Sequence, residues 1–95
     1  LNQDDILRRN IIQDLMCRFS LDYQIYESVF GIPFSRYFAT ELEDMKQLET
    51  LGLVRLKPHG LTVTPKGRFL IRNIAMVFDY HLRHKETKAK YSQTV

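Results

Sequence analysis

The sequence predicts a mainly helical α+β domain in which three helices are followed by a short β-hairpin and a long C-terminal helix. Apolar residues recur at helical spacing in four segments, and two short apolar runs lie between the third and the fourth. Gly and Pro separate these segments at positions where helices end or chains turn. The 95 residues are 44% hydrophobic and 26% charged, which fits one small domain over residues 1–95.

The first helix is expected to start at Asp4 or Asp5, either of which can cap it, and to reach about Phe19. On a helical wheel, one face of this segment is apolar. That face consists of Ile11, Ile12, Leu15 and Phe19, with Leu7 and Met16 beside them. Ile6 and Cys17 fall on the opposite face.

A short second helix is expected to follow, with Asp22 as its N-terminal cap and its end near Phe30. Gly31 suits a left-handed residue at the end of this helix, because glycine adopts that conformation without a steric penalty. Pro33 prevents the helix from continuing, since proline lacks the backbone donor that a helix needs.

The third helix is expected over residues 36–51, with Ser35 as its cap and Gly52 directly after its end. Four apolar residues at helical spacing predict its inward face. They are Phe38, Leu42, Met45 and Leu48.

A β-hairpin is predicted from the apolar runs at residues 53–56 and 61–63. The four residues between the runs read Lys-Pro-His-Gly, with proline at the second position and glycine at the fourth. These positions are typical of a type I turn. The hairpin therefore turns at residues 57–60.

The last helix is predicted to run from Pro65 to about Lys85, with Thr64 as its cap. A polar tail over residues 86–95 follows it. Three helices, a hairpin and a further helix make the element order of a winged-helix domain, in which the hairpin is the wing.

Charge placement argues against a winged helix that reads DNA. Residues 35–50, the candidate recognition helix, carry two basic and four acidic side chains, a net charge of −2. Such a helix would repel phosphates, whereas DNA binding depends on Lys and Arg. The basic surplus lies in residues 65–85, which pack behind the recognition helix in this fold. A winged helix that contacts protein is therefore favoured, and DNA binding remains the alternative.

The sequence also excludes several classes of function. The chain is too short for a TIM barrel or a Rossmann domain with a substrate domain, and it has no apolar run long enough to span a membrane. A single cysteine, Cys17, permits no internal disulfide or multi-cysteine metal site, which fits a reducing, cytoplasmic compartment. The histidines His59, His81 and His84 are expected to be ordinary surface residues. Nucleotide-binding and metalloprotease motifs are absent, so we expect no self-contained enzyme and no metal site.

The predicted last helix has two apolar stripes instead of one. Leu70, Ile71, Ile74, Ala75, Phe78 and Leu82 form the expected core stripe, and Phe69, Asn73, Met76 and Tyr80 form a second stripe. A domain of this size has little material to cover both sides, so the second stripe is either buried in its own domain or docks onto a partner. Ile6 and Cys17 add weaker support for docking, although Cys17 alone could be a small core residue.

Two segments together carry a family resemblance. Residues 12–23 include the run IQDLMCRF and, after Ser20, the run LDY, and residues 67–79 read GRFLIRNIAMVFD. Between them lie LGLV at residues 51–54 and VTPKG at residues 63–67. This ordered set resembles the C-terminal domain of the oxygen-independent coproporphyrinogen III oxidases, radical S-adenosylmethionine enzymes of haem biosynthesis. The resemblance extends over about residues 4–92, and the LMC and LIRNIAMVFD runs are more similar to the oxidases than to their haem-chaperone relatives.

The resemblance implies a larger oxidoreductase of which this chain is one domain. In that family an upstream, partial TIM-like barrel binds a 4Fe–4S cluster through a CxxxCxxC motif and also binds S-adenosylmethionine. The barrel converts two propionates of coproporphyrinogen III to vinyl groups, which gives protoporphyrinogen IX. This chain lacks the motif and begins with Leu1, so it is expected to be part of a longer protein and to hold no cofactor. By itself it should be inactive.

The resemblance further implies that this domain covers the open side of the barrel and helps to enclose the substrate. The substrate carries four carboxylates, and arginine binds carboxylates bidentately, so Arg72 is the first candidate for substrate binding, with Asn73 beside it. Arg68 is the less favoured candidate. The competing role for Arg72 is an ion pair with Asp79 or with the catalytic domain.

The expected partners are the upstream radical S-adenosylmethionine domain of the same protein and coproporphyrinogen III. The residues expected to dock onto that domain are Phe69, Met76, Tyr80, Ile6 and Cys17. No nucleic acid, no membrane and a monomeric state are expected. The alternatives are a free-standing winged-helix module that binds DNA or protein, and a haem-chaperone relative of the oxidase.

Overall fold

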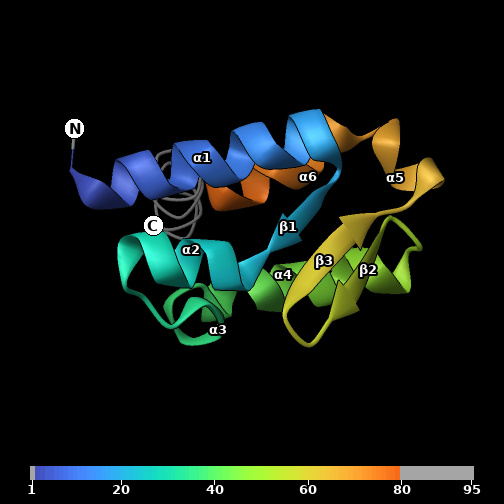
Figure 1. Cartoon of the computed structure of the whole chain (residues 1–95). Coiled ribbons are helices and arrows are strands. Elements are labelled where there is room, and N and C mark those ends of the chain that lie inside the picture. The colour runs from blue at the N-terminus through green and yellow to red at the C-terminus, as the bar shows by residue number, and fades with distance from the viewer. Residues whose placement is uncertain (1, 80–95) are drawn as a thin grey trace, which may run out of the picture.

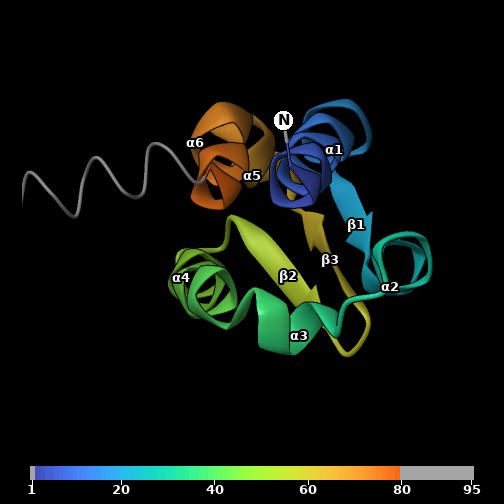
Figure 2. The same ribbon diagram turned by 90° about the vertical axis from the view of Figure 1, so that its left-hand side faces the viewer.

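Six helices, a 3₁₀ turn and a three-stranded sheet make up the computed structural model, which describes residues 2–79. In chain order the elements are α1 (Gln3–Arg18), β1 (Ser20–Asp22), α2 (Tyr23–Phe30), α3 (Phe34–Tyr37), α4 (Ala39–Thr50), β2 (Val54–Lys57), β3 (Gly60–Val63), α5 (Pro65–Arg68), α6 (Ile71–Ala75) and η1 (Met76–Phe78). Helix α6 lies alongside α1, and α4 lies along the hairpin β2–β3 (Figures 1 and 2). The predicted mainly helical α+β class is confirmed.

The sheet has the winged-helix topology. Its strand order is β1-β3-β2, with both pairs antiparallel. In the hairpin Lys57 is opposite Gly60, so Pro58 and His59 form the turn as predicted. Strand β1 was not predicted, because it has three residues and its partner β3 lies about forty positions further along the chain.

The N-terminal cap of α1 is Asn2, whose side chain accepts a hydrogen bond from the backbone N–H of Asp5 at 2.9 Å. The prediction of Asp4 or Asp5 as the cap was wrong. Both acids instead lie in the first turn, where a negative charge stabilises the helix dipole, and Asp4 is bound to Arg8. Gly31 and Gly52 are left-handed with φ of 66° and 79°, as predicted, and Asp22 caps α2.

The predicted third helix is divided into α3 and α4, with Phe38 between them. Ser35 does not cap it, because the helix already begins at Phe34, whose N–H donates to Glu27 of α2 at 2.9 Å. Phe34 is buried and its ring stacks on Tyr23 with centroids 4.1 Å apart. The start of the helix is therefore held by the buried Phe34 ring and by the hydrogen bond to Glu27. Phe38, Leu42, Met45 and Leu48 pack inward as predicted.

One long helix was predicted from Pro65 onward, and this prediction is wrong within the described residues. Helix α5 ends at Arg68, α6 begins at Ile71, and the chain becomes extended at Asp79. A Cβ on Gly67 would come within 1.9 Å of the Leu53 carbonyl oxygen, so α5 is held against the end of the hairpin while α6 follows α1. The chain must bend between the two contacts. Residues 80–95, including Leu82, His81, His84 and the predicted tail, lie outside the described residues.

The core lies between α1, the helices α2 to α4 and the inner face of the sheet. Ile74, Ala75 and Phe78 of the predicted core stripe are buried, and Ile71 is partly buried. Leu70 was predicted to be in the core but is 44% exposed, because it lies at the bend that precedes α6. The other fully buried side chains are Leu7, Ile11, Leu15, Phe34, Phe38, Met45 and Leu61.

Candidate functional site

An exposed aromatic and basic corner lies where α1 ends and α5 meets the bend before α6. Phe19 follows the last residue of α1, and the Arg68 guanidinium carbon lies 4.5 Å from the centroid of its ring. Phe69, the next residue, is 89% exposed. We call Phe19, Arg68 and Phe69 the α1–α5 corner. A large apolar side chain this exposed, beside a cation held over an aromatic ring, makes the corner a candidate binding surface.

The other predicted site residues are distributed over two further faces. Arg72 and Asn73 are exposed on α6, and Met76 is half-buried in η1. Ile6 and Cys17 are exposed on the outer face of α1, so Cys17 is not a core residue. Tyr80 lies outside the described residues. The structure therefore brings Arg68 and Phe69 together with Phe19, but it leaves Ile6 and Cys17 on a separate face of α1.

No ion pair forms between Arg72 and Asp79 within residues 2–79, and no carboxylate in this range pairs with Arg68. Residues 54–78 contain five basic residues and no acidic ones. These five are Arg55, Lys57, Lys66, Arg68 and Arg72. The hairpin and the segment after it therefore contribute only positive charges, although Glu49 and Asp22 of neighbouring elements lie beside the hairpin. This local excess of positive charge suits an anionic ligand or partner.

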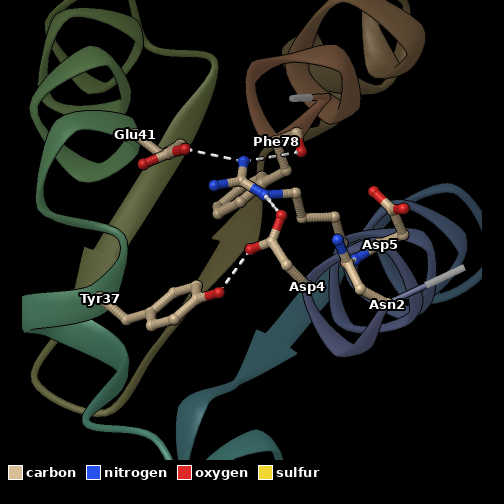
Figure 3. Close-up of polar contacts among 7 residues, drawn as sticks. Asn2, Asp4, Asp5, Tyr37, Glu41 and Phe78 are labelled. Carbon is tan, nitrogen blue, oxygen red and sulfur yellow. Dashed lines mark hydrogen bonds and ion pairs between the residues drawn. The ribbon is translucent and has the colours of Figure 1, made fainter. Parts of the chain in front are cut away.

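A second arginine site is buried at the other end of α1. Arg8 donates to Asp4 at 2.9 Å, to Glu41 at 2.8 Å and to the carbonyl oxygen of Phe78 at 3.1 Å (Figure 3). Tyr37 also donates a hydrogen bond to Asp4. Figure 3 shows how this network joins the start of α1 to α3, α4 and the end of η1.

The network is mainly internal, since the side chains of Arg8 and Glu41 are 12% and 5% exposed. Burial lowers the pKa of Arg8, but the hydrogen bonds and charges of Glu41 and Asp4 outweigh it, so its pKa is raised overall. The hydrogen bond to Asp4, and then burial, raise the pKa of Tyr37 to about 12. These residues hold the helices together and leave little room for a ligand.

Sequence reasoning missed this network, although one signal was available. Glu41 lies three residues after Phe38 and four before Met45, so it falls on the inward face of its helix. A carboxylate on such a face needs a buried cation. Which cation is supplied depends on tertiary packing, because Arg8 is 33 residues away in the sequence.

A shallow pocket lies at the tip of the wing. Its volume is about 370 Å³. It is lined by Leu21, Asp22, Gln24, Lys57, Pro58, His59 and Gly60. Asp22 is already engaged as the cap of α2, and no group of three potential metal ligands is found in residues 2–79. The α1–α5 corner is therefore the stronger candidate site.

None of the helices within residues 2–79 is long and apolar enough to cross a bilayer.

The fold defines the chain as a winged-helix domain with a helical extension after the wing. The model of the HemN C-terminal domain matches residues 1–70, and the chain belongs to this family. It is 46% identical over 99 residues to the oxygen-independent coproporphyrinogen III oxidase of Synechocystis sp. and 42% identical over 95 residues to that of Escherichia coli K12. Both alignments cover 100% of this chain and 21% of the relative.

A solved structure agrees with this assignment. The coproporphyrinogen III oxidase (HemN) from Escherichia coli, described as a radical SAM enzyme, has a TM-score of 0.83 and 44% sequence identity to this chain. The similarity covers 85% of this chain and 19% of that structure. The chain thus spans about a fifth of the length of the proteins it matches, as expected for one domain of a larger protein.

Proposed function

We propose that this chain is the C-terminal, substrate-enclosing domain of an oxygen-independent coproporphyrinogen III oxidase. The whole protein would convert two propionates of coproporphyrinogen III to vinyl groups, with loss of CO₂, and release protoporphyrinogen IX. The observation that carries the proposal is the exposed Phe69 beside Arg68, on a surface with no acidic residue from 54 to 78. Such a surface suits an apolar interior that contains carboxylates.

The cofactors belong to the upstream domain in this proposal. A 4Fe–4S cluster needs several thiolates, and this chain has one cysteine, Cys17, which is exposed and isolated on α1. The residues here do not fit a cluster. The contribution of this domain is to exclude water from the substrate and to help hold it, which radical chemistry requires.

The residues proposed to face the upstream domain are Phe69, Met76 and Tyr80, with Ile6 and Cys17 as a second contact. Arg72, Asn73 and Arg68 are proposed to face the substrate. We further propose that residues 1–95 form a single lid domain and that the whole protein is monomeric and cytoplasmic. It would bind neither nucleic acid nor membrane.

Full-length protein tests this function directly. Purified without oxygen and supplied with S-adenosylmethionine and a reductant, it should convert coproporphyrinogen III to protoporphyrinogen IX. A protein truncated before this chain should retain its cluster absorbance and lose turnover, and separately expressed residues 1–95 should restore part of it. Full turnover by the truncated protein would contradict the role as a lid.

Two other classes of function give different outcomes. The haem-chaperone relative would bind haem tightly and produce no vinyl groups, so a haem titration distinguishes it. A DNA-binding module would bind mixed duplex DNA tightly at low salt and lose affinity as salt rises. Glu41 of α4 is inside the fold, but on the surface Lys46 is paired with Glu43 and Glu49 adds a further negative charge, which disfavours DNA binding by this helix.

A further inference from the structure

Phe19 is held in an unfavourable backbone conformation at the end of α1. Its φ of 58° and ψ of 27° are left-handed, and it is the one non-glycine residue with positive φ among residues 2–79. Glycine performs the same task after α2 and α4, at Gly31 and Gly52. A bulky residue is disfavoured in this conformation, and glycine would satisfy the backbone there. The reason for a phenylalanine at position 19 therefore lies in the contacts of its ring.

The Phe19 ring lies between the core and Arg68. One part of the ring packs against the hydrophobic core, and the Arg68 guanidinium lies over its face at 4.5 Å. The backbones on both sides are fixed. Val63 donates its N–H to the Phe19 carbonyl at 2.8 Å, and Thr64 caps α5 by accepting from the N–H of Gly67 at 3.0 Å. The pair is therefore preorganised before any ligand arrives.

In the described part of the chain the Arg68 side chain contacts the Phe19 ring and donates no hydrogen bond to an oxygen atom, so its N–H donors are available to a ligand. No carboxylate within residues 2–79 pairs with Arg68, and the flanking sequence supplies none between residues 54 and 78. Arg72 also pairs with no carboxylate in the described part of the chain, but it has no aromatic ring there to orient it.

We propose that Arg68 is a preorganised carboxylate-binding residue and that Phe19 is the positioning residue that fixes its guanidinium. This inference rests on the proposed function for its ligand, which is a propionate of the porphyrinogen substrate or an acidic side chain of the upstream domain. Both ligands present the same planar carboxylate to the same edge of the guanidinium. The structure thereby favours Arg68 over Arg72, which the sequence had placed first.

The full-length protein carrying Arg68→Gln and Phe19→Leu, singly and together, tests this inference. If the ligand is a propionate, Arg68→Gln should raise KM for coproporphyrinogen III by about ten-fold with little change in kcat, as for loss of a charge-assisted hydrogen bond. Phe19→Leu should raise KM less, and Phe19→Tyr should restore it because tyrosine keeps the ring. The double variant should match Arg68→Gln alone, since Phe19 acts through Arg68.

Hydrogen exchange of the same proteins identifies the source of the carboxylate. A raised KM with unchanged exchange at residues 65–75 assigns the ligand to the substrate. An unchanged KM with faster exchange there assigns it to the upstream domain. Arg36→Gln, which removes an exposed cation from α3, outside the α1–α5 corner and residues 54–78, should change neither quantity.

The inference is overturned if Arg68→Gln changes neither KM nor exchange, or if the effects of the two substitutions simply add. Arg68 is exposed, so its variants should fold even if those of Phe19 do not. The proposed function fails separately, if the wild-type protein makes no protoporphyrinogen. Wild-type turnover with unaffected variants would remove only the role of Arg68.

Discussion

Within residues 2–79, Arg8 and Arg68 each lie over a phenylalanine ring, and their surroundings give them different roles. Arg8 lies 5.1 Å from the centroid of Phe38, and Arg68 lies 4.5 Å from that of Phe19. Arg8 is mostly buried and donates to Asp4, Glu41 and a backbone carbonyl. Arg68 is exposed, and no carboxylate in residues 2–79 pairs with it.

The difference teaches that stacking on a ring does not by itself identify a binding residue. What matters is whether hydrogen-bond donors remain after the fold has used its own acceptors. At Arg8 the fold supplies two carboxylates, and the result is a structural joint between α1, α4 and η1. At Arg68 the fold supplies only the Phe19 ring, so the N–H groups of the guanidinium can bind a carboxylate of another molecule.

The largest expected effect is on stability, at the buried arginine. Arg8→Met should reduce the free energy of unfolding by about 3 kcal/mol, because it leaves Glu41 buried without its guanidinium partner. Lys46→Met, which breaks the exposed pair with Glu43, should cost about 0.5 kcal/mol or less. Urea denaturation of residues 1–95 measures both. Equal losses for the two variants would show that burial does not distinguish these ion pairs.

Gly67→Ala should cause the next largest loss of stability. Gly67 precedes Arg68 in α5, so this substitution tests the packing that holds the α1–α5 corner in place. The added Cβ would lie 1.9 Å from the Leu53 carbonyl oxygen and must push α5 away from the hairpin. We expect a loss of about 2 kcal/mol from overpacking. Gly52→Ala is the matched control, since it meets no atom within 4 Å and adds only the cost of its left-handed backbone. Thermal denaturation that ranks Gly52→Ala as the more damaging would contradict the close contact.

Phe69→Ser should separate binding from folding. The side chain is 89% exposed, so the stability of the isolated domain should change by less than about 0.5 kcal/mol. In the full-length protein, kcat/KM should fall by about ten-fold, as expected when the burial of an aromatic side chain against the upstream domain is lost. Val29→Ser on α2 is the control, because Val29 is exposed but lies far from the corner in the sequence and on another helix. Equal activity of the two variants would remove Phe69 from the interface.

The smallest effect concerns pH near the buried arginine. The pKa of Tyr37 is raised to about 12 by its hydrogen bond to Asp4, so the folded state holds this proton more tightly than the unfolded state, in which the pKa is about 10. Its contribution to stability is therefore complete below about pH 10 and is lost as pH rises toward 12. Tyr37→Phe should flatten this part of the stability curve. Phenolate absorbance and urea denaturation at several pH values measure it, and an unchanged curve would contradict the shift.

Much of the local structure could be predicted from the sequence. The cap at Asp22, the left-handed Gly31 and Gly52, the Thr64–Pro65 helix start and the Pro58–His59 turn all occur as expected. Each depends on the backbone preference of one residue or on a hydrogen bond within a few positions. The winged-helix order and the inward face of α4 followed from the same local patterns.

The candidate site was predicted only in part. The sequence was enough to select Arg68 and Phe69 as candidate site residues, because they lie on or beside the second apolar stripe. The preference for Arg68 over Arg72 as the carboxylate-binding residue, however, depends on the contact with Phe19. Phe19 was assigned to the core face of the first helix and does pack against the core, but its ring also lies under Arg68 of α5. That contact joins residues 49 positions apart, so no helical wheel could show it.

The sequence by itself determined the composition of the domain, the approximate position of most helices and the purely cationic segment at residues 54–78. Tertiary structure decided the pairing of β1 with β3, the two helix breaks and the partner of each arginine. Caps and turns are governed by energies that act within one turn of the chain. Strand pairing, aromatic burial and the neutralisation of a buried charge depend on groups that only folding brings together.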